Sequence, residues 1–324
     1  MKRLLTRERL PILATSIVCL GLYFLAGFNF EGFFSLRVAF NFLTDNAFLG
    51  IIAVGLTFVI LTGGIDLSVG SMVGFSGILV AFLVDSKHWN PIAAMALALG
   101  CGAIVGLMHG YLIAKFDLAP FLVTLAGLFL CRGLALWISK ASIQIKDPLM
   151  TDMASFHLGL PGGASLTLSS ILFIAVLLIA IYVSRQTTFG RAVFAIGGGK
   201  QSAVLMGLRV PQTLIRVYVL SGVCSALGGI VFAIYTSSGN AIGGTGMELD
   251  AIAAVVVGGT LLSGGYGSIL GTFLGVLILA IIQTAITFQG TLSSWWTKIA
   301  IGTLLLIFML MQRGIVKATE RSAA

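Results

Sequence analysis

The stretch that decides the fold is Leu49–Gly77, which reads LGIIAVGLTFVILTGGIDLSVGSMVGFSG. Two apolar runs flank a short break at Gly63–Gly70, in which Asp66 is the one ionisable residue. Apolar runs that can cross roughly 30 Å of hydrocarbon are typical of membrane spans. Gly63 and Gly64 free the backbone between the runs. The stretch therefore predicts one membrane span, a tight turn and a second span.

The rest of the chain has the same apolar character. Of its 324 residues, 58% are hydrophobic and only 9% are charged, against roughly 25% charged residues in soluble proteins. Its 41 glycines are typical of helices that approach closely in lipid. This composition excludes an ordinary soluble globule. It predicts an all-α polytopic membrane protein in which residues 1–324 form a single transmembrane domain.

Apolar runs separated by polar breaks predict about ten transmembrane helices. Their expected ranges are 10–28, 46–62, 69–84, 92–113, 121–138, 166–183, 214–235, 249–262, 269–288 and 295–311. Within these ranges small residues recur at every fourth position at 94–110 and at 267–275. We interpret these stripes as helix-packing surfaces.

Basic residues indicate the orientation. If the N-terminus is cytoplasmic, thirteen of the nineteen Lys and Arg residues fall inside and four fall outside. The inner set begins with Lys2, Arg3, Arg7 and Arg9. Arg132 and Lys298 lie within spans. This asymmetry follows the positive-inside rule and predicts that both termini are cytoplasmic.

Two connecting loops are longer than the others. Ser139–Ser165 is expected on the outer, periplasmic side and Arg185–Thr213 on the inner side. The inner loop can form a short basic helix over Arg191–Ile196 and a second helix over Gln201–Leu208. It is either a charged loop that holds the topology or a docking surface for a cytoplasmic partner, and its length and apolar content favour docking.

Asp66 and Ser68 are the sharpest polar feature. They either cap the helix that begins after the break, or they lie at the mouth of a transport pathway. Arg132 either snorkels toward the outer headgroups or binds a polar partner in the bundle, including the hydroxyl groups of a solute.

Acidic residues also open the eighth run. Glu248 and Asp250 open a predicted helix after a glycine-rich outer loop, Ser237–Gly246. Capping and pairing with the helix dipole account for both acids, and their outer position leaves a docking or solute role open. The segment Gly258–Gly265 repeats Gly63–Gly70 with five identities in eight residues. Repeated breaks are found at transport pathways, although a glycine-rich chain also gives such matches by chance.

No constellation of catalytic residues is present, and no cofactor or metal site is predicted. The nearest approach to a phosphate-binding loop is Gly197–Lys200, which is followed by Gln201 and has Phe194 where the motif requires glycine. If the protein moves a solute uphill, the energy comes from an ion gradient or from a separate ATPase.

Several stretches together resemble the permease subunits of bacterial ABC sugar importers of the ribose type, over nearly the whole chain. They are Leu49–Gly77, APFLVTLAGLFLCRGLAL at Ala119–Leu136, TTFGRAVFAIGG at Thr187–Gly198, LSGVCSALGGI at Leu220–Ile230, and ELDAIAAVVVGGTLLSGGYGSILGT at Glu248–Thr272. The chain departs from the family pattern at Gly199-Lys200-Gln201 and at Ser139-Lys140-Ala141. Within the family it is most similar to permeases of galactofuranose importers.

The resemblance implies a permease of the bacterial inner membrane that carries a pentose or hexose. It would act with a second permease (identical or paralogous), with cytoplasmic ATP-binding subunits that hydrolyse the ATP, and with a periplasmic sugar-binding protein. Gly190, Arg191, Phe194 and Gly197 would couple the permease to the ATPase. The alternative is an ion-coupled secondary transporter built around Asp66.

Overall fold

The computed structural model describes residues 10–291 and 295–321, so the basic residues Lys2, Arg3, Arg7 and Arg9 lie outside the described residues. Helices account for all ten apolar runs. In order, the helices are α1 (Leu10–Asn29), α2 (Leu36–Asp45), α3 (Ala47–Leu61), α4 (Val69–Ala81), α5 (Pro91–Phe116), α6 (Pro120–Ile138), α7 (Pro148–Ser155), α8 (Leu168–Gln186), α9 (Thr188–Gly198), α10 (Lys200–Leu205), α11 (Val210–Thr236), α12 (Met247–Val257), α13 (Ile269–Gln289) and α14 (Trp295–Arg321).

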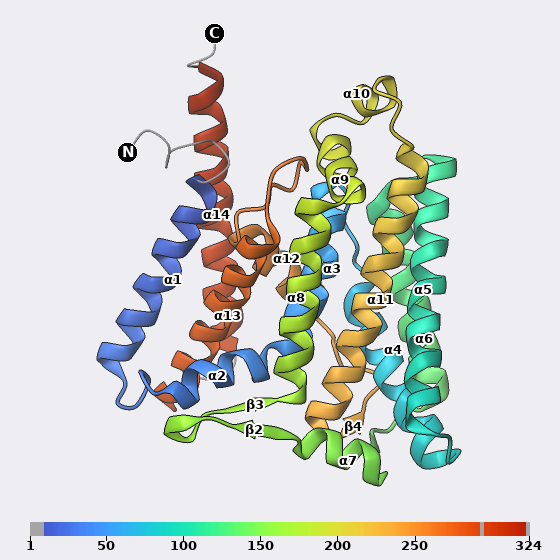
Figure 1. The fold of residues 1–324 in the computed structure, drawn as a ribbon, viewed down its shortest axis with the longest axis vertical. Coiled ribbons are helices and arrows are strands. Elements are labelled where there is room, and N and C mark those ends of the chain that lie inside the picture. The colour runs from blue at the N-terminus through green and yellow to red at the C-terminus, as the bar shows by residue number, and fades with distance from the viewer. Residues whose placement is uncertain (1–9, 292–294, 322–324) are drawn as a thin grey trace.

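Two small antiparallel sheets complete the described part of the chain. Strand β1 (Ile143–Gln144) pairs with β4 (Ser238–Gly239), and β2 (His157–Gly159) pairs with β3 (Ser165–Thr167). The strands and α7 lie at one end of the molecule, and α9 and α10 lie at the opposite end (Figure 1). Helix α1 begins and α14 ends on the α9 side. We call these the strand end and the α9 end.

Within the described ranges, seven helices are long and apolar enough to cross a membrane, or eight if α2 and α3, which are bent by 57°, count as one span. This is fewer than the ten predicted spans. Helix α12 ends at Val257, so its 11 residues reach only about 16 Å. The chain is thus an all-helical polytopic membrane protein with several short or broken segments.

Helices α3, α4 and α11 form the centre. Every residue of α3 except Phe48, and every residue of α4 except Leu79, is buried. A helix that is apolar on all sides is expected in such a position, because it has no face suited to water. Helices such as α1, α5 and α6 expose large apolar side chains, as lipid-facing helices do.

The predicted small-residue stripes lie where helices touch. A Cβ atom on Gly102 of α5 would come 2.5 Å from the carbonyl oxygen of Gly222 in α11. A Cβ atom on Gly275 of α13 would collide with the carbonyl oxygen of Ala254 in α12. Both glycines therefore allow backbone contact between helices, which confirms the packing interpretation.

Candidate transport site

Asp66 lies in the interior of the bundle, where it is 1% exposed. Its Oδ1 accepts hydrogen bonds from the backbone nitrogen and the hydroxyl of Ser68, at 3.0 and 2.6 Å. Its Oδ2 accepts a hydrogen bond of 2.8 Å from the hydroxyl of Ser221, on α11. The carboxylate thus closes a local turn before α4 and also fastens that turn to a distant helix. A buried carboxylate needs this many partners, because burial removes its hydration.

Ser68 occupies the cap position of α4 and is also buried. Its side chain makes no capping hydrogen bond to the helix, because its hydroxyl is donated to Asp66. Of the two predicted capping residues, Asp66 is therefore the one whose side chain accepts a backbone hydrogen bond at this turn, from the nitrogen of Ser68.

Helices α4 and α12 begin at the same place in the interior. A Cβ atom on Gly70, in the first turn of α4, would collide with Oε2 of Glu248 and come 3.1 Å from the backbone nitrogen of Glu248, in the first turn of α12. The two N-termini therefore meet, and the carboxylate of Glu248 lies against the first turn of α4. Helix N-termini carry partial positive charge, which favours an acidic side chain there.

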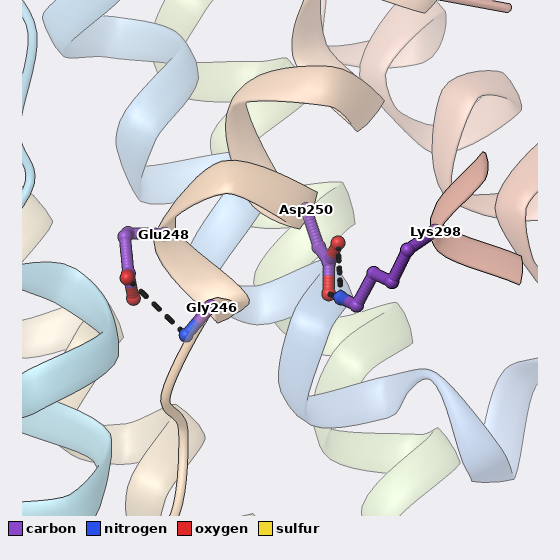
Figure 2. A network of polar contacts seen from close by, with 4 residues as sticks. All are labelled: Gly246, Glu248, Asp250 and Lys298. Carbon is purple, nitrogen blue, oxygen red and sulfur yellow. Dashed lines mark hydrogen bonds and ion pairs between the residues drawn. The ribbon is translucent and has the colours of Figure 1, made fainter. Parts of the chain in front are cut away.

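The two acidic residues in the first turn of α12, Glu248 and Asp250, make the polar contacts shown in Figure 2. Oε1 of Glu248 accepts a hydrogen bond of 3.2 Å from the backbone nitrogen of Gly246. Asp250 pairs with Nζ of Lys298 on α14, at 2.5 and 2.7 Å for its two oxygens. The capping prediction for Glu248 is confirmed. Lys298 binds Asp250 instead of only snorkelling to a headgroup.

Arg132 holds a non-helical segment inside the bundle. Its Nη1 donates to the carbonyl oxygens of Ala241 and Gly243, at 2.6 and 2.9 Å. In the segment 237–246, predicted as an outer loop, Ala241 is 1% exposed whereas Ile242 is 62% exposed. The carbonyls of Ala241 and Gly243 pack against Gly74 of α4. Buried carbonyls in lipid need donors. The snorkelling prediction for Arg132 is therefore wrong, and its alternative, a polar partner in the bundle, is confirmed.

The two glycine-rich breaks meet at the α9 end. The backbone nitrogen of Gly265 donates to the carbonyl oxygen of Leu61 at 2.9 Å. A Cβ atom on Gly197, in the last turns of α9, would collide with that same carbonyl and with the nitrogen of Gly265. We call residues 61–64, 197–198 and 263–265 the glycine junction. Through it, α9 touches both breaks directly.

Helix α9 is fastened to the core at its other end too. The hydroxyl of Thr187 accepts a hydrogen bond from the nitrogen of Gly190, and a Cβ on Gly190 would collide with the carbonyl of Ser184. Phe194 is half-buried and packs against the central core, whereas Arg191 is exposed. Of the four predicted coupling residues, three therefore seat α9 and only Arg191 presents a free side chain.

Helix α10 supplies a feature that sequence reasoning did not single out. It ends in three exposed apolar residues, Val204, Leu205 and Met206, of which Leu205 is 88% exposed. They lie at the α9 end (Figure 1). Ser221 was also missed. Its signal was the spacing of two serines, Ser221 and Ser225, on one face of an otherwise apolar helix.

Comparison with known proteins identifies the family. The family described as "branched-chain amino acid transport system / permease component" matches residues 38–309. The inner membrane ABC transporter permease protein YjfF of Escherichia coli K12 is 49% identical over 97% of this chain and 95% of its own. The fructose import permease protein FruG of Bifidobacterium longum is 34% identical over 96% and 93%. The ribose import permease protein RbsC of Escherichia coli K12 is 36% identical over 86% of each. No solved structure matches the chain.

These matches extend over nearly the full length of each relative, and they leave the ion-coupled alternative without support. An ABC permease is the membrane component of a transporter whose family also has ATPase and binding-protein partners. The chain therefore belongs to the ABC-transporter permease family, in its carbohydrate-uptake branch, and is a multi-pass subunit of the inner membrane that is not itself catalytic.

Proposed function

We propose that the chain forms the pathway by which an ATP-driven importer carries one monosaccharide, a pentose or a hexose, into the cell, with galactofuranose among the candidates. The support is chemical as well as comparative. The relatives are named for ribose and fructose import, and the interior of this chain offers hydroxyl, carboxylate and guanidinium groups.

The pathway is proposed to run beside Asp66, Ser68 and Arg132. These residues stabilise two non-helical segments, 62–68 and the partly buried 237–246. Irregular backbone at membrane depth is tolerated where it is enclosed by protein or lines a cavity, and it marks the pathway in many transporters. A second permease, identical or paralogous, would complete the pathway.

The segment Arg185–Thr213 is proposed to face the cytoplasm and to dock onto the ATPase through Gly190, Arg191, Phe194 and Gly197. The observation that carries this proposal is the glycine junction, because any displacement of α9 acts on both breaks at once. The apolar end of α10 adds anchors for a groove on the partner. The strand end, with 139–165, would then meet the periplasmic sugar-binding protein.

The transport proposal is tested by uptake of radiolabelled pentoses and hexoses in cells that lack this chain. We expect uptake of one sugar to be lost and to return with the wild-type chain. If no sugar depends on the chain, the proposal is overturned.

The docking proposal is tested by co-purification of the ATPase subunit with Arg191→Glu and with Leu205→Asp. Each variant is expected to lower the recovered ATPase at least tenfold. Leu158→Asp is the matched control, since Leu158 is an exposed leucine, 50% accessible, in β2 at the strand end. Equal recovery with the α9-end variants and the control would remove the docking assignment.

A further inference from the structure

A cavity of about 220 Å³ opens near the α9 end. Its wall combines Thr62 and Gly64 from the first break, Ile196 from α9, Lys200 from α10, the link Asp117–Pro120 and Tyr218 from α11. The volume far exceeds the roughly 30 Å³ that one water occupies. It is below the roughly 300 Å³ at which pockets for drug-sized ligands begin. A molecule the size of a monosaccharide matches it.

Tyr218 supplies a hydroxyl that lacks a partner. The side chain is 1% exposed, and its hydroxyl makes no hydrogen bond to any part of the chain that the structure describes. A Cβ atom on Gly64, another lining residue, would come 2.5 Å from this oxygen, so the hydroxyl lies directly against the backbone of Gly64. Buried hydroxyl groups nearly always have partners. The missing partner is therefore expected to come from the cavity.

An ion pair lies at the mouth of the cavity, and its two charges cancel. Nζ of Lys200 lies 2.6 Å from Oδ1 of Asp117, and the two side chains are 53% and 84% exposed. Apart from Thr62 and Tyr218, which carry hydroxyl groups, the other walls are apolar side chains, such as Leu214, and backbone. Such a lining favours a neutral ligand with hydroxyl groups over an ion, because an ion would lose hydration without gaining an opposite charge.

We propose that this cavity binds one neutral, sugar-sized polyol from the α9 end, and that the bound molecule holds α9 against the first break. Ile196 and Lys200 line the cavity from one side of the glycine junction and Thr62 and Gly64 from the other, so an occupant contacts both α9 and the break. Sugar that accumulates on the α9 side then slows the transport cycle. The proposal rests on the proposed function, which makes the transported sugar the natural occupant.

The test uses the assembled transporter in proteoliposomes, with ATP and the transported sugar enclosed on the α9 side. ATPase activity is measured against the enclosed sugar concentration for wild type and for Tyr218→Phe. We expect the half-inhibitory concentration to rise at least tenfold in the variant. Without sugar, Tyr218→Phe is expected to keep wild-type thermal stability, since the lost hydroxyl had no partner in the described chain.

Two controls and a second variant make the outcome decisive. Tyr235→Phe, on the same helix, removes a hydroxyl bonded to Asp45 and should leave inhibition unchanged. Ala119→Phe fills the cavity from an exposed lining position and should abolish inhibition, while Ala141→Phe, exposed and outside the cavity lining, should not. If sugar uptake is normal and the half-inhibitory sugar concentration is the same in the wild type and all four variants, this proposal is overturned and the proposed function stands. Loss of sugar-dependent uptake in the wild type would instead overturn the proposed function.

Discussion

The two glycine-rich breaks share five of eight residues and fold differently. In the first, Gly63–Gly70, the chain enters the bundle, and both Asp66 and Ser68 are buried. In the second, Gly258–Gly265, residues 258–260 are buried and the chain then turns at the surface, where Leu262 and the following Tyr266 are exposed. The second break also closes on itself, since the nitrogen of Leu261 donates to the carbonyl of Tyr266 at 2.9 Å. The shared glycines thus end a helix in both breaks, but they do not determine whether the chain that follows is buried or exposed.

The aligned position that differs most is Asp66, which matches Leu261 in the second break. The carboxylate can satisfy the backbone of its own turn and a hydroxyl from α11 together. A leucine offers no acceptor, so the second break must satisfy its backbone locally. One polar side chain therefore explains why one break is internal and the other is superficial.

The largest expected effect comes from removing that side chain. Asp66→Ala leaves the nitrogen and hydroxyl of Ser68 and the hydroxyl of Ser221 without their acceptor in the interior. We expect a loss of at least roughly 3 kcal/mol, given about 1 to 3 kcal/mol for each of the three buried donors. Thermal unfolding of the purified protein measures it. Leu261→Ala is the control, and equal losses in the two variants would contradict the comparison.

Gly197 joins the two breaks, and Gly197→Ala is expected to force them apart. Its new Cβ would strike backbone atoms of Leu61 and Gly265, which cannot rotate away. Overpacking of this kind costs about 1 to 3 kcal/mol. Gly198→Ala is a control on the next residue, where a Cβ meets nothing within 4 Å. Comparable unfolding temperatures for the two variants would show that the glycine junction is not rigid.

Removing one hydroxyl group near each break compares the polar contacts of the two breaks directly. Ser221→Ala removes a bond to the carboxylate of the first break and should cost about 2 kcal/mol. Thr260, in the second break, has a buried Oγ1 with no partner in the described ranges. Thr260→Val keeps its shape and should change the free energy of unfolding by less than about 1 kcal/mol. A costly Thr260→Val would reveal a polar role for the second break.

The smallest expected effect concerns Asp117, which lies at the α9 end. Its side chain is exposed, whereas that of Asp66 is buried. The hydrogen bond and positive charge of Lys200 lower the pKa of Asp117 below its ordinary 3.8. Since the folded state favours the ionised form, the contribution is present above that value and is lost as pH falls through the lowered pKa. We expect only a slight pH-dependent difference in unfolding temperature between wild type and Asp117→Asn. A large difference would mean that solvent exposure does not determine how much these carboxylates contribute to the free energy of unfolding.

Much of the fold follows from composition and periodicity. The apolar runs place the helices, and the four-residue glycine spacing locates contacts such as Gly102 with Gly222. Periodicity does not show where a break lies relative to the membrane. For this reason the burial of Ala241 within a predicted loop was not foreseen, and α12 was expected to be longer than its 11 residues.

The candidate site was predictable in its residue types and not in its partners. An arginine or aspartate within an apolar chain marks an interior polar contact. Arg132, however, binds carbonyls more than one hundred residues away, and Asp66 binds Ser221 across 155 positions. Such pairings depend on how helices cross, which local sequence does not encode.

The head-to-head start of α4 and α12 has an electrostatic consequence. Each N-terminus contributes about half a positive charge, and Arg132 adds one more. The carboxylates of Asp66 and Glu248 together supply two negative charges. These contributions balance, so this part of the interior carries little net charge. A region of this kind gives an ion no advantage over an uncharged solute.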